Sequence, residues 1–514
     1  MSPQNFLILG GGISGLTAAW YLARNAPLTT KITVLETSKR FGGWIESKRV
    51  GKDKILFEQG PRTLRPFGLG GLVVLDMANK LNLTESIHTI PKNSPAAQNR
   101  YIFYPDKLVK LPGSNFFSGM TQILSTRFLL ESIPAIIREP FVEPQRLEED
   151  ESIHSFITRR FNEKISNILI SAIVHGIYAG DIKKLSMKST FTNLYKMEKS
   201  HGSILKGSFS GESFLSTKDL TWIQDINRNN KDLMNTLKKS SLYSFKDGIE
   251  QLVLALVEDL KTRSNVELKT LTNVKELKFK EENDEIEILT NNGNFKGDHV
   301  ISTIPAYELK KLLPVLPHLE YNPFVTVGVV NIAYDRPNLL PVKGFGVLIP
   351  QVTPNNPYHV LGIVFDSDAM PLQDHPKTNY TKVTLMLGGH YYYYNSLRKE
   401  GEEELLLFNN EEQLLNHSLQ TLEKVLGIYA TPVEYQIKLQ RKCIPQYYVG
   451  HHSRIRELHN VIKKEFKNKL SVSGSSYLGV SINDCVVNSA KLALNLLDPK
   501  QEMIVTGLES VENE

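Results

Sequence analysis

A short apolar run at residues 6–9 leads directly into three glycines. Four consecutive apolar residues followed by turn residues are typical of a buried strand. Apolar side chains then recur at helical spacing, at Leu16, Ala19, Trp20 and Ala23. A second apolar run, at residues 31–35, ends at Glu36. The pattern therefore predicts a strand, a glycine-rich turn, a helix and a second strand.

Further strands are expected in two groups. A helix at about 243–260 precedes the first group, for which we expect strands at 266–268, 274–279, 286–289 and 300–304. These strands are assigned to the same sheet as residues 6–9, and Asn-Asn-Gly at 291–293 is a hairpin signal between them. The second group predicts a separate sheet-based domain, with strands at 325–332, 346–349, 359–365 and 382–387 and a helix at 402–425. A strand, a glycine turn and a helix recur at 470–485.

The middle of the chain predicts helices and one linker. Residues 108–141 are rich in Phe, Leu and Ile, but three prolines interrupt them, which is too broken for a membrane-spanning helix. They fit a helical region that dips an apolar face, including Phe116, Phe117, Phe128 and Leu129, into a membrane surface. A helical subdomain that buries this face on itself is the alternative. The polar composition of residues 201–239 predicts a linker.

Composition narrows the class of protein. The 514 residues correspond to about three structural units, and 41% hydrophobic with 22% charged residues is ordinary for a globular protein. A net charge of +5 is too small for a dedicated nucleic-acid binder, so no nucleic-acid partner is expected. The two cysteines, Cys443 and Cys485, exclude a disulfide framework, and we expect no metal site because the histidines lack ligand spacing.

The N-terminal glycines form a Gly-x-Gly-x-x-Gly motif over residues 10–15. Gly10 would make the tight turn, Gly12 would let backbone N–H groups approach a pyrophosphate, and Gly15 would let the helix pack closely on the strand. Glu36, about twenty residues further on, ends the second strand where the ribose of a dinucleotide would lie. The motif therefore predicts dinucleotide binding on an α/β, Rossmann-like domain.

Additional motifs make the prediction more specific. Residues 37–44, Thr-Ser-Lys-Arg-Phe-Gly-Gly-Trp, resemble the second flavin signature of amine-oxidase-like flavoproteins. Further segments carry a closer resemblance, at 60–62, 178–181, 344–346, 361–367, 386–389, 444–447 and 479–485. With them the chain is similar, from Gly10 to about Leu497, to the oxygen-dependent protoporphyrinogen oxidases. Trp44 stands where the wider family commonly has a basic residue, and Ser489 stands where it often has Gly.

The resemblance implies a set of site residues. Non-covalent FAD would be held by Gly10, Gly11, Gly12, Ile13, Ser14, Gly15, Glu36, Thr37, Arg40, Gly43, Trp44, Gly60, Pro61, Arg62, Thr63, Val274, Ser475, Val480, Ser481 and Ile482. Arg100 would pair with a substrate propionate, and Leu348 and Met386 would hold the tetrapyrrole rings. From the residues alone, Arg100 also fits a solvated surface side chain. No catalytic acid or base is identified, because the flavin would carry the redox step.

The resemblance also implies a domain division and an activity. The implied fold combines an α/β, Rossmann-like FAD-binding domain (1–90, 240–305 and 441–514) with a helical membrane-binding domain (91–215) and a mixed-sheet substrate domain (306–440). The implied reaction is six-electron oxidation of protoporphyrinogen IX to protoporphyrin IX with O2 as acceptor, giving H2O2, the penultimate step of haem biosynthesis. The alternatives are an FAD-dependent amine oxidase, a polyene desaturase, and a non-catalytic carrier like the Rab GDP-dissociation inhibitors.

The expected location follows from the same resemblance. We expect peripheral association with the mitochondrial inner membrane, and no cleavable presequence is evident before the apolar run at 6–9. Contact with ferrochelatase and formation of a homodimer are left open.

Overall fold

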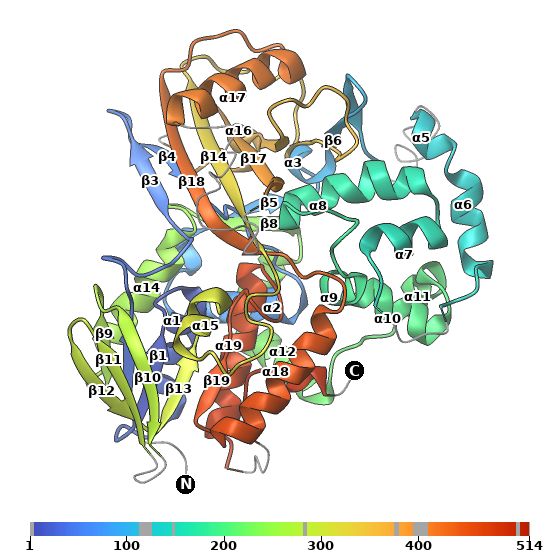
Figure 1. The fold of residues 1–514 in the computed structure, drawn as a ribbon. Coiled ribbons are helices and arrows are strands. Elements are labelled where there is room, and N and C mark those ends of the chain that lie inside the picture. The colour runs from blue at the N-terminus through green and yellow to red at the C-terminus, as the bar shows by residue number, and fades with distance from the viewer. Residues whose placement is uncertain are drawn as a thin grey trace.

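The computed structural model describes residues 5–112, 126–145, 150–280, 285–374, 380–393, 410–499 and 504–512. Its first unit is a five-stranded parallel sheet in the order β19-β13-β1-β2-β9 (Figure 1). These strands are β1 (Asn5–Leu9), β2 (Lys31–Leu35), β9 (Val266–Lys269), β13 (His299–Ser302) and β19 (Leu470–Val472). Strands from three distant parts of the chain therefore form one sheet, and the strand predictions for 6–9, 31–35, 266–268 and 300–304 are confirmed. The strands predicted at 274–279 and 286–289 also form, but their assignment to this sheet is wrong, because β10 (Val274–Lys280) and β11 (Glu285–Thr290) pair with each other in a separate antiparallel sheet.

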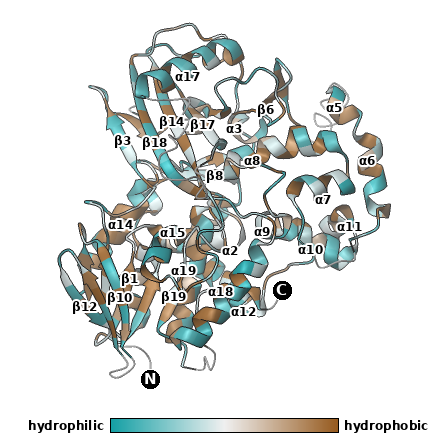
Figure 2. Cartoon of the chain, viewed as in Figure 1, coloured by the Kyte–Doolittle hydropathy of each residue, from teal (hydrophilic) through white to brown (hydrophobic). Residues whose placement is uncertain are grey.

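The parallel sheet is buried on both faces. Phe6 and Ile8 of β1 pack into one cluster with helices α1 (Ile13–Asn25), α2 (Gly68–Lys80), α14 (Glu250–Lys261) and α19 (Ile482–Leu497). Leu7 and Leu9 pack on the other side. There they meet α15 (Ala306–Leu312), α18 (His451–Phe466) and the antiparallel sheet of β10 (Val274–Lys280), β11 (Glu285–Thr290) and β12 (Gly293–Gly297). This is why β1 is a continuous apolar run rather than an alternating one, as Figure 2 shows.

A second, seven-stranded sheet has the order β18-β14-β17-β16-β15-β6-β7. Its strands are β6 (Arg100–Phe103), β7 (Leu108–Lys110), β14 (Phe324–Tyr334), β15 (Gly346–Leu348), β16 (Val360–Val364), β17 (Thr381–Tyr393) and β18 (Glu434–Pro445). Helix α17 (Glu411–Leu426) contributes to the hydrophobic cluster on one face. The second sheet was expected, but the helical prediction is wrong at 108–110, because β7 pairs with β6 there. Of the helix predicted at 402–425, residues 402–409 lie outside the described residues.

Helices from residues 127–210 form a third region, which lies beside the seven-stranded sheet in Figure 1. It contains α5 (Arg127–Leu130), α6 (Ile133–Arg138), α7 (Ile153–Arg160), a π-helical turn (Ile165–Ile170), α8 (Ser171–Tyr178), α9 (Met187–Thr190), α10 (Thr192–His201) and α11 (Ile204–Ser210). The fully buried Arg160 donates to Glu139 and Glu198. A buried charge is tolerated only when it is paired in this way, so this network ties the segment around Glu139 to α7 and α10.

The linker predicted at 201–239 is wrong. Residues 204–237 form α11, α12 (Thr217–Asn229) and α13 (Lys231–Leu237). The hydroxyls of Ser203 and Ser216 cap α11 and α12 by accepting the N–H groups of Lys206 and Asp219. Ile226 of α12 is buried in the cluster that also contains α2. A polar composition was mistaken for a linker because each helix exposes most of its surface and buries a narrow apolar stripe.

Two shorter strand pairs connect these regions. Strands β3 (Ser47–Val50) and β4 (Ile55–Glu58) form a hairpin, and β5 (Ile87–Pro91) pairs with β8 (Ser240–Phe245). The helix predicted at about 243–260 is therefore wrong at its start, because residues 243–245 belong to β8 and the helix begins at Glu250. Within the described ranges, no helix is both long enough and apolar enough to cross a membrane.

Candidate active site

The glycine-rich loop between β1 and α1 presents its backbone to open space. Gly10, at φ +100°, donates its N–H to the carbonyl oxygen of Leu35 at 2.9 Å, which turns the loop over the end of β2. A Cβ on Gly15 would lie 1.9 Å from the carbonyl oxygen of Gly10, so a side chain cannot fit there. A Cβ on Gly12 would instead have only Gly43 Cα within reach, at 4.0 Å. The loop is therefore closely packed at Gly15 and has free space beside Gly12.

The first turn of α1 is free to receive an anion. Its N-cap is Gly12, and no side chain of the described residues caps the helix. Ile13 and Ser14 are buried in this turn. An uncapped helix N-terminus combines unsatisfied N–H groups with the positive end of the helix dipole, which suits a phosphate.

Glu36 lies at the end of β2, against the glycine loop. One carboxylate oxygen accepts the N–H of Gly11 at 2.7 Å, and the other accepts the N–H of Ser38 at 2.7 Å. Thr37 beside it is exposed. An acidic residue in this position of a βαβ unit can accept a ribose hydroxyl.

The segment 40–44 packs its two glycines onto the first glycine loop. The N–H of Gly42 donates to the carbonyl oxygen of Gly11 at 2.8 Å. Arg40 donates to the carbonyl oxygens of Gly43 at 2.6 Å and Ile45 at 2.9 Å, so its guanidinium shapes this loop. Trp44 is 39% exposed.

Arg62 enters the site from the turn after β4. It is 7% exposed, and its Nη1 donates to Asp366 at 2.8 Å. Its Nε and Nη2 atoms are buried and have no hydrogen-bond partner among the described residues, and the same is true of the Gln59 amide. Buried donors without acceptors are costly, so a group with acceptor atoms is expected beside them. Gly60, Pro61 and Thr63 surround Arg62 in the same turn.

Glu58 lies in the strand that leads to this turn and is buried. Its carboxylate accepts the Ser47 hydroxyl at 2.7 Å and the Ile249 N–H at 2.8 Å. Burial raises the pKa of Glu58 to about 7 despite these donors. Glu58 is therefore a carboxyl group that exchanges a proton near neutral pH.

The C-terminal site residues return to the first loop from the far end of the chain. Ile482 of α19 packs in the same cluster as Ile13. Ser481 caps α19 in a capping box with Asp484, so this helix N-terminus is closed by a side chain, unlike that of α1. Ser475 and Val480 lie between β19 and this cap. Val274, at the start of β10, packs against the cluster that contains Leu35.

Ser489, which stands where the family often has Gly, lies in α19. Ser489 is fully buried, and its hydroxyl hydrogen-bonds the hydroxyl of Ser473 at 2.8 Å. The serine therefore fits between α19 and the sheet with its polar atom satisfied.

The seven-stranded sheet places the predicted substrate residues in one cross-strand row. Leu348 pairs with Gly362, and Gly362 pairs with Met386. Directly opposed residues of adjacent strands point to the same face of a sheet, so Leu348 and Met386 share a face. A Cβ on Gly362 would lie 3.1 Å from Leu348 Cδ2. Because glycine has no Cβ, the Leu348 side chain can lie close to the backbone of Gly362.

Arg100 lies two residues along β6 from the position opposite Leu348. It pairs with Gly346 and is exposed. Partial burial, followed by the positive charge of Arg65, lowers the pKa of Arg100. Arg65 is a charged residue that the predicted site set did not include, although the sequence shows it three residues after Arg62. Two neighbouring guanidinium groups favour an anion between them.

The histidines and cysteines have structural surroundings. His175 Nδ1 lies 2.6 Å from the carbonyl oxygen of Ile349, and its Nε2 lies 3.0 Å from Nε2 of His390. Burial lowers the pKa of His175 to about 4 and of His390 to about 3. Burial raises the pKa of Cys443 and of Cys485 to about 12, so both are protonated, unreactive thiols at neutral pH. The described part of the chain contains no cluster of three metal-ligating side chains.

Taken together, these features define a dinucleotide-binding flavoprotein with a sheet-lined substrate side. The open cradle over Gly12, the uncapped α1, Glu36 and the unpartnered donors of Arg62 fit the phosphates, ribose and ring acceptors of FAD. Residues 13–491 match the family model described as flavin containing amine oxidoreductase. The chain belongs to this family, and it is an FAD-dependent oxidoreductase.

Relatives within the family carry a more specific name. The protoporphyrinogen oxidase of Schizosaccharomyces pombe is 38% identical over 505 residues, which cover 96% of this chain and 98% of the relative. The human protoporphyrinogen oxidase is 32% identical over 502 residues, with coverage of 96% and 98%. A crystal structure of a putative protoporphyrinogen oxidase from Exiguobacterium sp. 255-15 superposes with a TM-score of 0.75 at 22% identity and covers 96% of this chain and 99% of that chain.

Proposed function

We propose that this protein oxidises protoporphyrinogen IX to protoporphyrin IX, with O2 as the electron acceptor. The observation that carries the proposal is the 38% identity to a protoporphyrinogen oxidase over nearly the full length of both chains. Removal of six electrons in three steps consumes three O2 and releases three H2O2. When bound, FAD supplies the two-electron acceptor for each step. An amine or polyene substrate is less well supported, because the identities above are to enzymes named for porphyrinogen.

The proposed cofactor contacts follow from the site described above. Gly10–Gly15 and the first turn of α1 would hold the pyrophosphate, and Glu36 with Thr37 would lie at the ribose. The remaining proposed contacts are Gly43, Trp44, the turn 60–63, Val274, Ser475, Val480, Ser481 and Ile482. We propose that FAD is not covalently attached, since Cys443 and Cys485 are both protonated thiols at neutral pH.

The substrate side of the proposal rests on the shape and charge of the sheet face. A porphyrinogen is a large apolar ring system with acidic propionate groups at one edge. Leu348, Gly362 and Met386 provide a continuous apolar row, and Arg100 with Arg65 provides positive charge beyond one end of it. An Arg fork binds a carboxylate with two parallel hydrogen bonds, which would orient the ring on this row.

A membrane contact is proposed for the helical region, and the structure changes which residues are its candidates. Phe128 and Leu129 are buried in a cluster with Ile102, so they are core residues rather than membrane anchors. Phe116 and Phe117 lie outside the described residues. Three other hydrophobic side chains are strongly exposed and define the outer helical patch: Ile137 (68%), Phe141 (81%) and Phe209 (89%).

The surroundings of the outer helical patch support this role. Helix α11 packs against the turn at Glu139–Phe141, so the patch is shared by adjacent elements. Lys206 lies 6.0 Å from the Phe141 ring, and Arg138 ends α6 beside it. Exposed aromatic residues next to basic side chains are typical of a peripheral contact with anionic lipid. We propose peripheral attachment to the mitochondrial inner membrane through this patch. The proposal also includes contact with ferrochelatase and formation of a homodimer, both carried over from the resemblance.

The decisive experiment is anaerobic mixing of the purified, FAD-loaded protein with protoporphyrinogen IX. The flavin absorption near 450 nm, a general property of oxidised flavin, should bleach and should return when O2 is admitted. A primary amine at the same concentration is the matched control substrate. Bleaching by the amine and none by protoporphyrinogen IX would contradict the proposed substrate and leave the flavoprotein class unchanged.

A further inference from the structure

The segment Gln446–His451, which links β18 to α18, contacts the helical region and the loop that precedes β14. Gln446 donates its side-chain N–H to the carbonyl oxygen of Tyr178 in the helical region at 2.9 Å. Its backbone N–H donates to the carbonyl oxygen of Pro323 at 2.9 Å. The next residue, Tyr447, accepts the N–H of Ser186 on its carbonyl oxygen at 2.8 Å. The segment is therefore held rigidly before its side chains reach the cofactor side.

The Tyr447 hydroxyl joins the two ends of a turn in the proposed FAD site. It donates to the carbonyl oxygen of Ser475 and accepts the N–H of Gly479 at 3.0 Å. Tyr447 is 1% exposed, so no water competes for these hydrogen bonds. The turn is flanked by Gly474 at φ +110° and Gly479 at φ +138°. Because glycines leave the backbone conformationally free, the turn depends on outside contacts for its shape.

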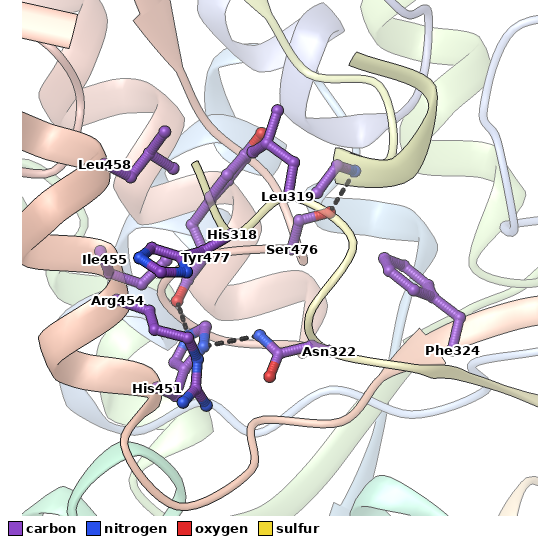
Figure 3. Close-up of a pocket in the computed structure, with 11 residues that line it drawn as sticks. His318, Leu319, Asn322, Phe324, His451, Arg454, Ile455, Leu458, Ser476 and Tyr477 are labelled. Carbon is purple, nitrogen blue, oxygen red and sulfur yellow. Dashed lines mark hydrogen bonds between the residues drawn. The ribbon is translucent and has the colours of Figure 1, made fainter. Parts of the chain in front are cut away.

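His451 holds the middle of the same turn. Figure 3 shows its ring between Asn322 and the backbone of Tyr477, with a hydrogen bond on each side. The Asn322 amide N–H donates to Nδ1 at 2.7 Å, so Nε2 carries the proton and donates to the carbonyl oxygen of Tyr477 at 2.8 Å. The His451 ring stacks on the Tyr447 ring, with centroids 4.1 Å apart and an angle of 5°.

These groups form a support rather than a binding site of their own. The cavity beside His451, Asn322 and Tyr477 has a volume of about 20 Å³, which admits a water molecule but no larger ligand. Burial lowers the pKa of His451 to about 3, so the ring is neutral and keeps the hydrogen-bond pattern given above. Three side-chain hydrogen bonds join Tyr447 and His451 to the turn 475–479.

We propose that Tyr447 and His451 are positioning residues that preform the turn 475–479 to receive FAD. Asn322 assists them by selecting the His451 tautomer. The inference rests on the proposed contacts of Ser475 and Val480 with FAD. A preformed turn avoids ordering a flexible glycine-flanked segment when FAD binds, and this raises the affinity.

Replacing Tyr447 by Phe tests this directly, because it removes the hydroxyl and retains the ring stack. Tyr477→Phe is the matched control: its hydroxyl is also buried, two residues from Ser475, and it has no partner among the described residues. FAD is stripped from each protein, the Kd of FAD is measured by quenching of flavin fluorescence, and the melting temperature of each apoprotein is recorded. The visible spectrum of the bound flavin at saturating FAD is a further readout.

We expect Tyr447→Phe to raise the Kd of FAD at least tenfold, equivalent to about 1.4 kcal/mol, and to shift the bound-flavin spectrum. Tyr477→Phe should stay within about twofold of wild type, and the two apoproteins should melt within a few degrees of each other. A Kd for Tyr447→Phe equal to that of wild type would overturn the proposal, as would a loss of affinity matched by Tyr477→Phe.

A second variant decides the question if Tyr447→Phe does not fold. Asn322 is half-buried, so Asn322→Ala is tolerated more easily, and it releases the constraint on the His451 tautomer. We expect this variant to raise the Kd about threefold, and an unchanged Kd would overturn the proposal. Wild-type protein that binds no FAD would contradict the proposed cofactor site itself, which is a separate result.

Discussion

A substitution at Gly12 should abolish FAD binding without affecting folding. In the structure a Cβ at this position meets only Gly43 Cα, at 4.0 Å, and the backbone lies at φ −74° and ψ −179°, where any residue is allowed. Valine at position 12 therefore fits the apoprotein without a clash. Its branched side chain would project into the space above the uncapped N-terminus of α1. We expect Gly12→Val to fold normally and to lose FAD.

The size of the effect follows from the contacts that valine would block. A hydrogen bond to a charged group contributes about 1.5 to 3 kcal/mol, and the helix N-terminus adds about 0.3 to 1 kcal/mol. Losing one or two such contacts to the pyrophosphate should cost about 3 kcal/mol, which raises the Kd of FAD by over 100-fold. The melting temperature of the apoprotein should change by no more than about 4 °C, as for a substitution without a clash.

The assay compares Gly12→Val with Gly15→Ala. At Gly15 a Cβ would lie 1.9 Å from the carbonyl oxygen of Gly10, so Gly15→Ala must displace α1 from β1 and should lower the melting temperature of the apoprotein sharply. FAD content is read from the 280 to 450 nm absorbance ratio, and the Kd from titration of the apoprotein. Gly12→Val protein that purifies yellow, with a Kd within threefold of wild type, would refute the pyrophosphate assignment of this loop.

Three further predictions concern the substrate, the membrane and pH. Arg100→Ala should lower kcat/KM for protoporphyrinogen IX by about 10- to 150-fold at unchanged flavin content, and Arg100→Lys should recover part of it; wild-type kinetics for Arg100→Ala would make Arg100 a surface residue only. Replacing the three residues of the outer helical patch by Ser should release the protein from anionic vesicles in a flotation assay. Leu28→Ser, at a similarly exposed site, should leave vesicle binding unchanged. Vesicle binding retained by the patch variant would show that the patch is not the membrane contact. The pKa of Glu58 is raised to about 7, so between about pH 4.5 and pH 7 the folded protein holds a proton on Glu58 that the unfolded chain has released. The stability of the folded state therefore falls as the pH rises through this range. Glu58→Gln should therefore gain stability over wild type across this range, by about 3 kcal/mol at pH 8 in urea unfolding, and a pH-independent difference would contradict the shift.

The first site elements were readable from the sequence because they are local. Residues 6–36 hold the strand, the glycine turn, the helix and the acidic residue within one short stretch, and the structure places them as the spacing predicts. Apolar runs bounded by turn residues also located most strands of both sheets. A strand buried on both faces needs a continuous apolar run. A position where a Cβ would lie within about 2 Å of a backbone oxygen, as at Gly15, needs glycine. Both requirements can be read directly from the residue types.

Other features depend on contacts between distant residues. β6 joins the seven-stranded sheet by pairing with β15, about 245 residues later, and this pairing brings Arg100 onto the same sheet as Leu348 and Met386. The positive charge of Arg65 beside Arg100, and the contact of Tyr447 with both ends of the turn 475–479, arise in the same way.

The sequence by itself determined the glycine loop, its helix and the binding of a dinucleotide, because hydrogen bonds and backbone conformation within about thirty residues decide them. Only the tertiary structure decided which apolar residues are core and which are exposed: Phe128 and Leu129 turned inward, while Phe141 and Phe209 remained outside. Both kinds of residue look alike in a hydrophobic pattern. Burial is set by which partner surface packs against them, and that surface is assembled from segments far apart in the chain.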